Sequence, residues 1–219
     1  MIYKAKKTYR SKEVASKYEE KRFKSLKGWF VNKRELGLID KALKYAGITP
    51  PATILDIPCG TGRVSVHLAK MGFDIIATDI SSEMISYAKE KVNSLNDLSG
   101  NIKFEVADAE CLPYVTDSFD ACISLRFLGH IPDKSRKRIL KEMIRVTKKY
   151  LILAYYLKSS LQYHLRKRKR RGRGIEWHPL NLREVEEELT AVGLKKVKIF
   201  FLLPLISETV IFLCAKQEL

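Results

Sequence analysis

The sequence lacks a long apolar run, a secretory signal and any cysteine pair. Its most apolar stretch, residues 199–215, is interrupted by Pro204, Ser207 and Glu208, which favours two strands and a turn over a membrane span. No apolar core follows the basic residues at the N-terminus, so we expect no signal peptide and a cytoplasmic protein. The four cysteines stand apart, which predicts free thiols and no zinc or other metal site: Cys59, Cys111, Cys122 and Cys214.

What is present is a basic chain with enough apolar residues for a sizeable core. It has 219 residues, 46% of them hydrophobic, and a net charge of +16. The charge is uneven: residues 131–219 hold 21 Lys and Arg against 9 Asp and Glu, whereas residues 51–130 hold 6 against 11. Two interpretations stay open, a solvated surface or attraction to a polyanion.

Short apolar segments alternate with amphipathic ones over most of the chain, which predicts an α/β fold with a mostly parallel sheet. The expected strands cover residues 53–57, 74–79, 102–106, 119–125, 150–156, 197–203 and 208–215. The last two are too close for a crossover helix, so they must pair antiparallel. We expect one domain over 1–219, divided into an N-terminal helical cap (1–48), a core (50–156), a basic insertion (157–180) and a C-terminal helix with the strand pair (181–219).

A glycine-containing loop, Gly60-Thr61-Gly62, follows the first predicted strand and precedes a helix. Such a loop is either a plain turn or a place where the backbone approaches a ligand. Asp56, Asp79 and Asp108 follow three successive strands, so all three should face one crevice, although each alone could be a turn residue. A nicotinamide-binding loop would need a third glycine where this chain has Ser65, and Asp56 would repel a pyrophosphate.

The ordered motifs resemble those of class I S-adenosylmethionine (SAM)-dependent methyltransferases of the small single-domain type, a group that includes quinone methyltransferases. They are the segment 56–62, Asp79, Asp108-Ala109, Leu112-Pro113, Phe119-Asp120 and 130–133. The resemblance covers roughly residues 50–155. It implies a Rossmann-like sheet of seven strands with the last antiparallel, helices on both faces, and SAM as cofactor with S-adenosylhomocysteine (SAH) as product.

The resemblance also implies a role for individual residues. Gly60 and Gly62 would face the methionine part of SAM, in a loop that includes Cys59 and has Pro58 in place of the family's first glycine. Asp56 would lie near the cofactor amino group and Asp79 would hold the ribose. The adenine would contact Ile80, Met84, Asp108 and Ala109. Leu125 and Arg126 would lie near the amino-acid end, where Arg126 departs from the usual small or polar residue; it binds the cofactor carboxylate, binds an anionic substrate or is a surface charge.

Orientation of an acceptor behind the activated methyl group supplies much of the catalysis in such a reaction. Where the acceptor carries a proton, His130 and then His178 are the candidate bases, and a structural role is the alternative for each. Tyr18 and Arg22 are predicted to cap the site.

Seven of the eight residues in 166–173 are cationic, and aromatic residues flank them. Arg166, Arg168, Arg170 and Trp177 are therefore candidate substrate contacts. We expect methyl transfer to an anionic small molecule or lipid-linked acceptor. The alternatives are an RNA methyltransferase that uses the basic segment, a non-catalytic polyanion-binding module, and a bare mobile loop at 166–173.

Overall fold

The computed structural model describes residues 25–170 and 177–217, and within them the chain forms a seven-stranded sheet. The strands are β1 (Thr53–Asp56), β2 (Asp74–Asp79), β3 (Ile102–Val106), β4 (Phe119–Ser124), β5 (Thr147–Tyr156), β6 (Leu194–Phe201) and β7 (Thr209–Lys216). Their order is β3-β2-β1-β4-β5-β7-β6. β7 pairs antiparallel with both β5 and β6, and the other pairs are parallel, which confirms the predicted topology.

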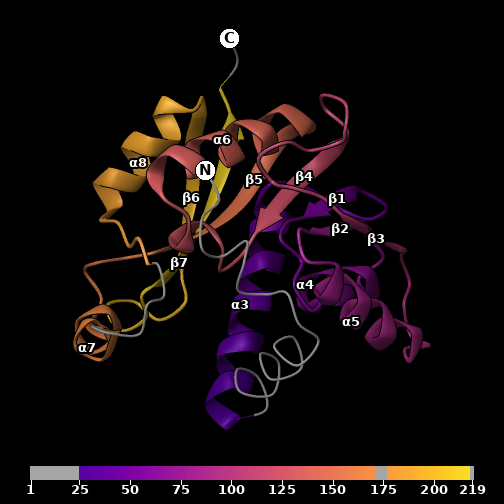
Figure 1. The fold of residues 1–219 in the computed structure, drawn as a ribbon, viewed down its shortest axis with the longest axis horizontal. Coiled ribbons are helices and arrows are strands. Elements are labelled where there is room, and N and C mark those ends of the chain that lie inside the picture. The colour runs from indigo at the N-terminus through magenta and orange to yellow at the C-terminus, as the bar shows by residue number, and fades with distance from the viewer. Residues whose placement is uncertain (1–24, 171–176, 218–219) are drawn as a thin grey trace.

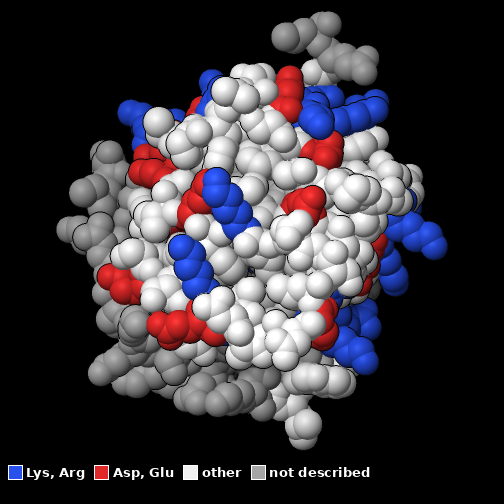
Figure 2. Space-filling model, turned by 90° about the vertical axis from the view of Figure 1, so that its right-hand side faces the viewer, with Lys and Arg blue, Asp and Glu red and all other residues white. Residues whose placement is uncertain are grey.

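Helices cover both faces of this sheet (Figure 1). They are α3 (Leu26–Tyr45), α4 (Arg63–Lys70), α5 (Ser82–Asn93), α6 (Asp133–Val146), α7 (Leu161–Arg170) and α8 (Leu182–Ala191), with a 3₁₀ turn η1 (Leu128–His130) after β4. Buried residues of α3, α4 and α5 pack on one face, and those of α6 and α8 on the other. Figure 2 shows the side of the molecule that is at the right in Figure 1, where cationic and anionic side chains are interspersed.

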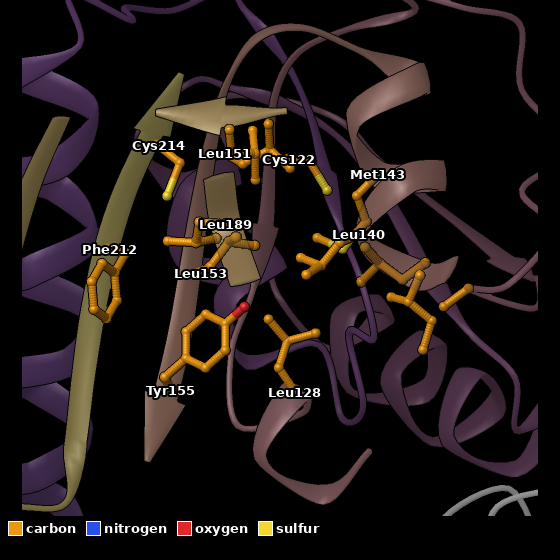
Figure 3. Packing of buried hydrophobic residues seen from close by; sticks show 14 of the residues in the cluster. Cys122, Leu128, Leu140, Met143, Leu151, Leu153, Tyr155, Leu189, Phe212 and Cys214 are labelled. Carbon is orange, nitrogen blue, oxygen red and sulfur yellow. The ribbon is translucent and has the colours of Figure 1, made fainter. Parts of the chain in front are cut away.

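The central strands are apolar on both faces because helices bury both. Along β5, Leu151, Leu153 and Tyr155 belong to the cluster under α6 and α8, part of which Figure 3 shows. Ile152 and Ala154, between them, belong to the cluster under α3 and α4. The alternation follows from the two-residue period of a strand, and it explains why β5 appears in the sequence as one continuous apolar run.

Local sequence signals set the ends of several helices. The Ser81 side chain accepts a hydrogen bond from the Met84 amide and caps α5. Asn181 and Glu184 form a reciprocal capping box at the start of α8. Gly193, with φ of 88°, follows the end of the same helix.

The first part of the basic insertion is the helix α7, which the sequence analysis does not predict. Ser160 lies directly before this helix, and its hydroxyl accepts a hydrogen bond from the Tyr163 amide. A serine in that position is an N-cap signal, and neither proline nor glycine interrupts residues 161–170. Tyr18, Arg22 and the first half of the expected N-terminal helical cap lie outside the described residues, as do the side chains of Arg168 and Arg170.

Within the described ranges, no helix is long and apolar enough to span a bilayer. The same part of the chain contains no group of three or more His, Cys, Asp or Glu side chains arranged to hold a metal ion. The four cysteines are free, as predicted, with Cys111 exposed and the other three buried.

Candidate active site

The predicted site residues gather at the edge of the sheet where β1, β2, β3 and β4 end. These strands are neighbours, and β1 stands between β2 and β4, where the strand order reverses. Crevices at such a switch point are the usual ligand sites of open α/β sheets. Asp56, Asp79 and Asp108 end or follow β1, β2 and β3, so the topology brings them to this edge together.

The loop from β1 to α4 is tied to both neighbouring strands. The Ile57 amide donates to the Ile123 carbonyl of β4 (2.9 Å), and the Cys59 amide donates to the Thr78 carbonyl of β2 (2.7 Å). Gly60 and Gly62 have φ of 54° and 74°, a left-handed backbone that glycine adopts without strain. A β-carbon on Gly60 would meet nothing within 4 Å, so the backbone there borders open space.

Asp79 holds this loop in place. One of its carboxylate oxygens accepts the Gly60 amide (3.0 Å) and the other accepts the Ser81 amide (2.9 Å). Burial raises the pKa of Asp79, and the backbone amides of Ser81, Gly60 and Ile80 oppose that rise. A carboxylate has about four acceptor sites, so it can accept a further donor. The carboxylate therefore joins the glycine loop to the start of α5 and retains the capacity to accept hydroxyl groups of a ligand.

Asp56 is 1% exposed and lies behind the glycine loop. Burial raises its pKa to about 7, against the opposing effects of the Ser65 hydroxyl, which donates to it over 2.6 Å, and of nearby Arg63. Ser65 occupies the place of a third glycine and is itself buried, so its hydroxyl has a structural partner there. A carboxyl of this kind is easily returned to its charged form by a neighbouring cation.

The residues predicted to surround an adenine lie along the ends of β2 and β3. Asp108 accepts the Glu110 amide (3.0 Å) in a short turn and is half-buried, while Ala109 and Met84 are buried. Ile80 is half-buried and directly follows Asp79. The Ala107 amide donates to the Asp79 carbonyl (3.1 Å), which holds the ends of the two strands together.

Glu35 is a residue of the site that the sequence did not reveal. It lies on α3, is 1% exposed, and forms ion pairs with two arginines, Arg63 at the start of α4 (3.1 Å) and Arg126 after β4 (2.8 Å). Arg126 also donates through Nε to Glu35 (3.0 Å), so it is bidentate and is not a free surface charge. Nothing local marks Glu35, because its partners are distant in the sequence.

The two candidate bases lie near the ends of β4 and β5. His130 ends η1, and its ring packs edge-on against Tyr156, with centroids 5.5 Å apart. The His178 amide donates to the Gly129 carbonyl (2.7 Å), which places residues 129, 130 and 178 side by side. Both histidines are half-buried.

A cavity of about 510 Å³ lies beside this pair of histidines, between α6, α7 and residues 177–180. Tyr163 and Trp177 form part of its wall, with ring centroids 5.1 Å apart and planes at 36°. Lys158 and Lys167 line it too. Lys158 pairs with Glu184 (2.8 Å), whereas Lys167 has no carboxylate partner among the described residues and lies 5.9 Å from the Tyr163 ring centre.

Arg166, which the sequence predicts as a substrate contact, has a partner within the protein. It forms an ion pair with Glu208, which is buried just before β7. The pair fastens α7 to the sheet, since the partner charge belongs to the core and not to a ligand. Trp177 does line the cavity, as a substrate contact would.

A buried network supports the wall of the cavity. Arg136 of α6 is 3% exposed and binds Glu188 of α8 with Nε and Nη2, at 2.5 to 2.8 Å, and donates to the Ile131 carbonyl. The Tyr155 hydroxyl donates to the same carboxylate (2.9 Å). The network fixes α6 against α8 and β5, because each buried polar group in it has a partner.

Comparison with known proteins finds a family and several relatives that are similar to part of this chain. Residues 54–150 match the family described as "Methyltransferase domain". The chain is 34% identical over 115 residues to norajmaline N-methyltransferase of Rauvolfia serpentina, covering 50% of this chain and 38% of that protein. It is 40% identical over 101 residues to the ubiquinone/menaquinone biosynthesis C-methyltransferase of Rickettsia peacockii, covering 43% of this chain and 40% of that protein. The chain thus spans about two fifths of the length of these relatives.

The fold extends the likeness beyond the matched residues. The crystal structure of magnesium protoporphyrin IX methyltransferase from Synechocystis with bound SAH superposes with a TM-score of 0.73, covering 94% of this chain and 98% of that one at 18% identity. The sheet order, the glycine loop and the acids at the ends of β1 to β3 agree with the resemblance stated from the motifs. Residues 54–150 are therefore similar to methyltransferase domains, and the chain has the fold of the SAM-dependent methyltransferases.

Proposed function

We propose that this protein transfers the methyl group of SAM to an anionic acceptor, either a small molecule or a lipid-linked compound. The observation that carries the proposal is the clamp between Asp79 and the glycine loop. It presents a carboxylate with spare acceptor capacity beside open backbone at Gly60. The carboxylate can accept hydrogen bonds from the ribose hydroxyls of SAM, and the open backbone leaves room for its methionine part.

The residues at this edge fit SAM better than a dinucleotide. SAM carries an ammonium and a sulfonium, and the buried Asp56 would gain a favourable partner from either cation. A pyrophosphate would instead face Asp56 and Asp79, which repel it. Arg126, held by Glu35, would be the candidate for the cofactor carboxylate.

When bound, SAM supplies a methyl group that is already activated for displacement. The chain's own contribution is to align the acceptor on the far side of that methyl and to exclude water. His130 and His178 lie between the cofactor edge and the cavity, so either could take a proton from an acceptor hydroxyl or amine.

The cavity beside α7 supports an anionic acceptor. Its aromatic wall of Tyr163 and Trp177 offers a face for stacking, and Lys167 offers a charge without a described carboxylate partner. The names of the relatives indicate acceptor atoms as different as a nitrogen of norajmaline and a carbon in ubiquinone or menaquinone biosynthesis. The chemistry of the cavity therefore supports a class of acceptor, an anion with an apolar or aromatic part, rather than one compound.

The first test is direct binding of SAH, NAD and ATP by calorimetry. Binding of SAH alone supports the cofactor assignment, and binding of NAD without SAH contradicts it. Transfer of label from radioactive SAM into a fractionated cell extract then identifies the acceptor class. Label in small acidic molecules or lipids supports the proposal, whereas label in ribonuclease-sensitive material makes the acceptor RNA.

A further inference from the structure

Four large apolar side chains are exposed together where α7 meets the loop between β6 and β7. Leu161 and Leu165 of α7 are 56% and 63% exposed, and Leu205 and Ile206 of the loop are 84% and 55% exposed. The Leu161 amide donates to the Leu205 carbonyl (2.9 Å), and the Gln162 amide donates to the Ile206 carbonyl (3.0 Å). The helix and the loop are thus joined, and we call these four side chains the α7 edge.

The structure holds the α7 edge in place rather than leaving it as a loose tip. The Arg166–Glu208 ion pair fastens the helix to the start of β7, and Gln162 Oε1 accepts the Glu208 amide (3.1 Å). The Ser207 amide donates to the Leu203 carbonyl (2.9 Å) within the loop. Exposure of these apolar groups is therefore a property of an ordered element.

The α7 edge adjoins a segment of one charge sign. Residues 157–170 contain six Lys and Arg and no Asp or Glu. Lys158 and Arg166 are paired with Glu184 and Glu208, and the other four cations stand together at 167–170. Residues 203–207 contain no charge at all. The face in Figure 2, by contrast, mixes the two signs. Apolar side chains next to a purely cationic helix complement one kind of surface, an anionic lipid bilayer with an apolar interior.

The shape of the α7 edge favours a membrane over a protein partner. Figure 1 shows α7 at the periphery of the molecule, beside the loop that follows β6. A stable protein interface buries about 800 Å² on each side and is built around a central apolar region. Four side chains on one helix and one loop are too few for that, but they suit shallow insertion among headgroups, which needs only an apolar signal and a basic one.

We propose that the α7 edge docks this protein on the surface of anionic membranes, with Leu161, Leu165, Leu205 and Ile206 inserted at the headgroup boundary and the cationic helix near the phosphates. The opposite side of α7 carries Tyr163 and Lys167, which line the cavity. Docking therefore places the cavity one helix diameter, ~10 Å, from the membrane surface. The docking itself requires neither SAM nor an acceptor.

The test is sedimentation of the full chain with vesicles of phosphatidylcholine alone and with added phosphatidylglycerol. The test variant is Leu165→Gln with Leu205→Asn, in which glutamine suits a helix and asparagine tolerates the φ of 61° at position 205. The matched control is Val106→Thr with Val115→Thr, since these side chains are 56% and 78% exposed and lie elsewhere on the chain. Neither double variant changes the charge.

We expect the wild type and the control to bind the anionic vesicles, and the test variant to bind at least roughly tenfold more weakly at near-physiological salt. If both double variants bind the anionic vesicles equally well, the binding is only adsorption of a basic protein, and the proposal is wrong. It is also wrong if the test variant keeps its vesicle binding and loses binding to a single-stranded RNA oligonucleotide. Thermal unfolding and SAH titration of each variant check the fold and test the methyltransferase assignment separately.

Discussion

Asp56→Asn is expected to make the protein more stable above neutral pH, because the native carboxyl is ionised there at a cost. Burial raises the pKa of Asp56 from the ordinary 3.8 to about 7. One pKa unit corresponds to about 1.4 kcal/mol, so ionisation of this group within the fold costs about 4 kcal/mol. The unfolded carboxyl loses its proton near pH 4 and the folded one near pH 7. Over this interval the folded state binds more protons, and stability falls as the pH rises.

The variant removes this pH dependence and leaves that of every other group in place. The amide oxygen that replaces the carboxylate can still accept the Ser65 hydroxyl, and any cost of the amide is the same at each pH. The free energy of unfolding of the variant, minus that of the wild type, should therefore rise by about 3 kcal/mol between roughly pH 5 and pH 8.

Urea unfolding of both proteins at about pH 5, 6.5 and 8 measures this difference, with equal slopes as a check on two-state behaviour. A difference that stays constant with pH would show that Asp56 ionises normally, and the account of the buried carboxyl would be wrong. SAH titrations of the same two proteins test whether Asp56 contributes to cofactor binding. If Asp56 serves the cofactor cation, the affinity of the wild type rises with pH up to about 7 and that of the variant does not.

Three further changes test separate parts of the structure. Asp79→Ala removes an acceptor for the ribose and for the Gly60 amide, so SAH affinity should fall by roughly 1.5–3 kcal/mol, as measured by calorimetry; unchanged affinity would remove Asp79 from the site. Glu188→Gln leaves the buried Arg136 with only the exposed Asp133, 3.6 Å away, as a countercharge and should cost about 3 kcal/mol of unfolding free energy, whereas a cost under about 1 kcal/mol would contradict the network. Gly129→Ala would bring a β-carbon within 2.2 Å of the Tyr156 ring, so the midpoint of thermal unfolding should drop, and adding Tyr156→Leu should restore most of the loss.

The sheet, its antiparallel strand and several helix ends were predictable because their signals are local. A two-residue or 3.6-residue apolar period, a serine or asparagine cap and a glycine after a helix each act within a few residues. The same rules explain α7, for which the sequence analysis predicts no helix although the cap at Ser160 is a local signal. The placement of Asp56, Asp79 and Asp108 at one edge of the sheet also follows from the order of elements, because the carboxyl ends of parallel strands lie at the same edge.

The cluster around Glu35 could not be predicted in this way. Its three members come from α3, from the start of α4 and from the segment after β4. No periodicity relates residues 35, 63 and 126. A sequence specifies each residue's type but not its partner, and for charged groups the partner decides the role. Arg136 is the same case: on the sequence it belongs to a basic surface helix, and in the structure it is almost completely buried against Glu188.

This dependence on partners also changes what the basic segment implies about the substrate. A count of cations in 166–173 treats each as available to an anion, but Arg166 already neutralises Glu208, a buried carboxylate of the sheet. Lys158, near the same cavity, is likewise paired with Glu184. Of the described cations lining the cavity, Lys167 is the one whose charge is not matched by a described carboxylate. The case for an anionic acceptor thus depends more on Lys167 and the Tyr163–Trp177 wall than on the number of arginines, and Lys167→Gln should lower acceptor use without changing SAH affinity.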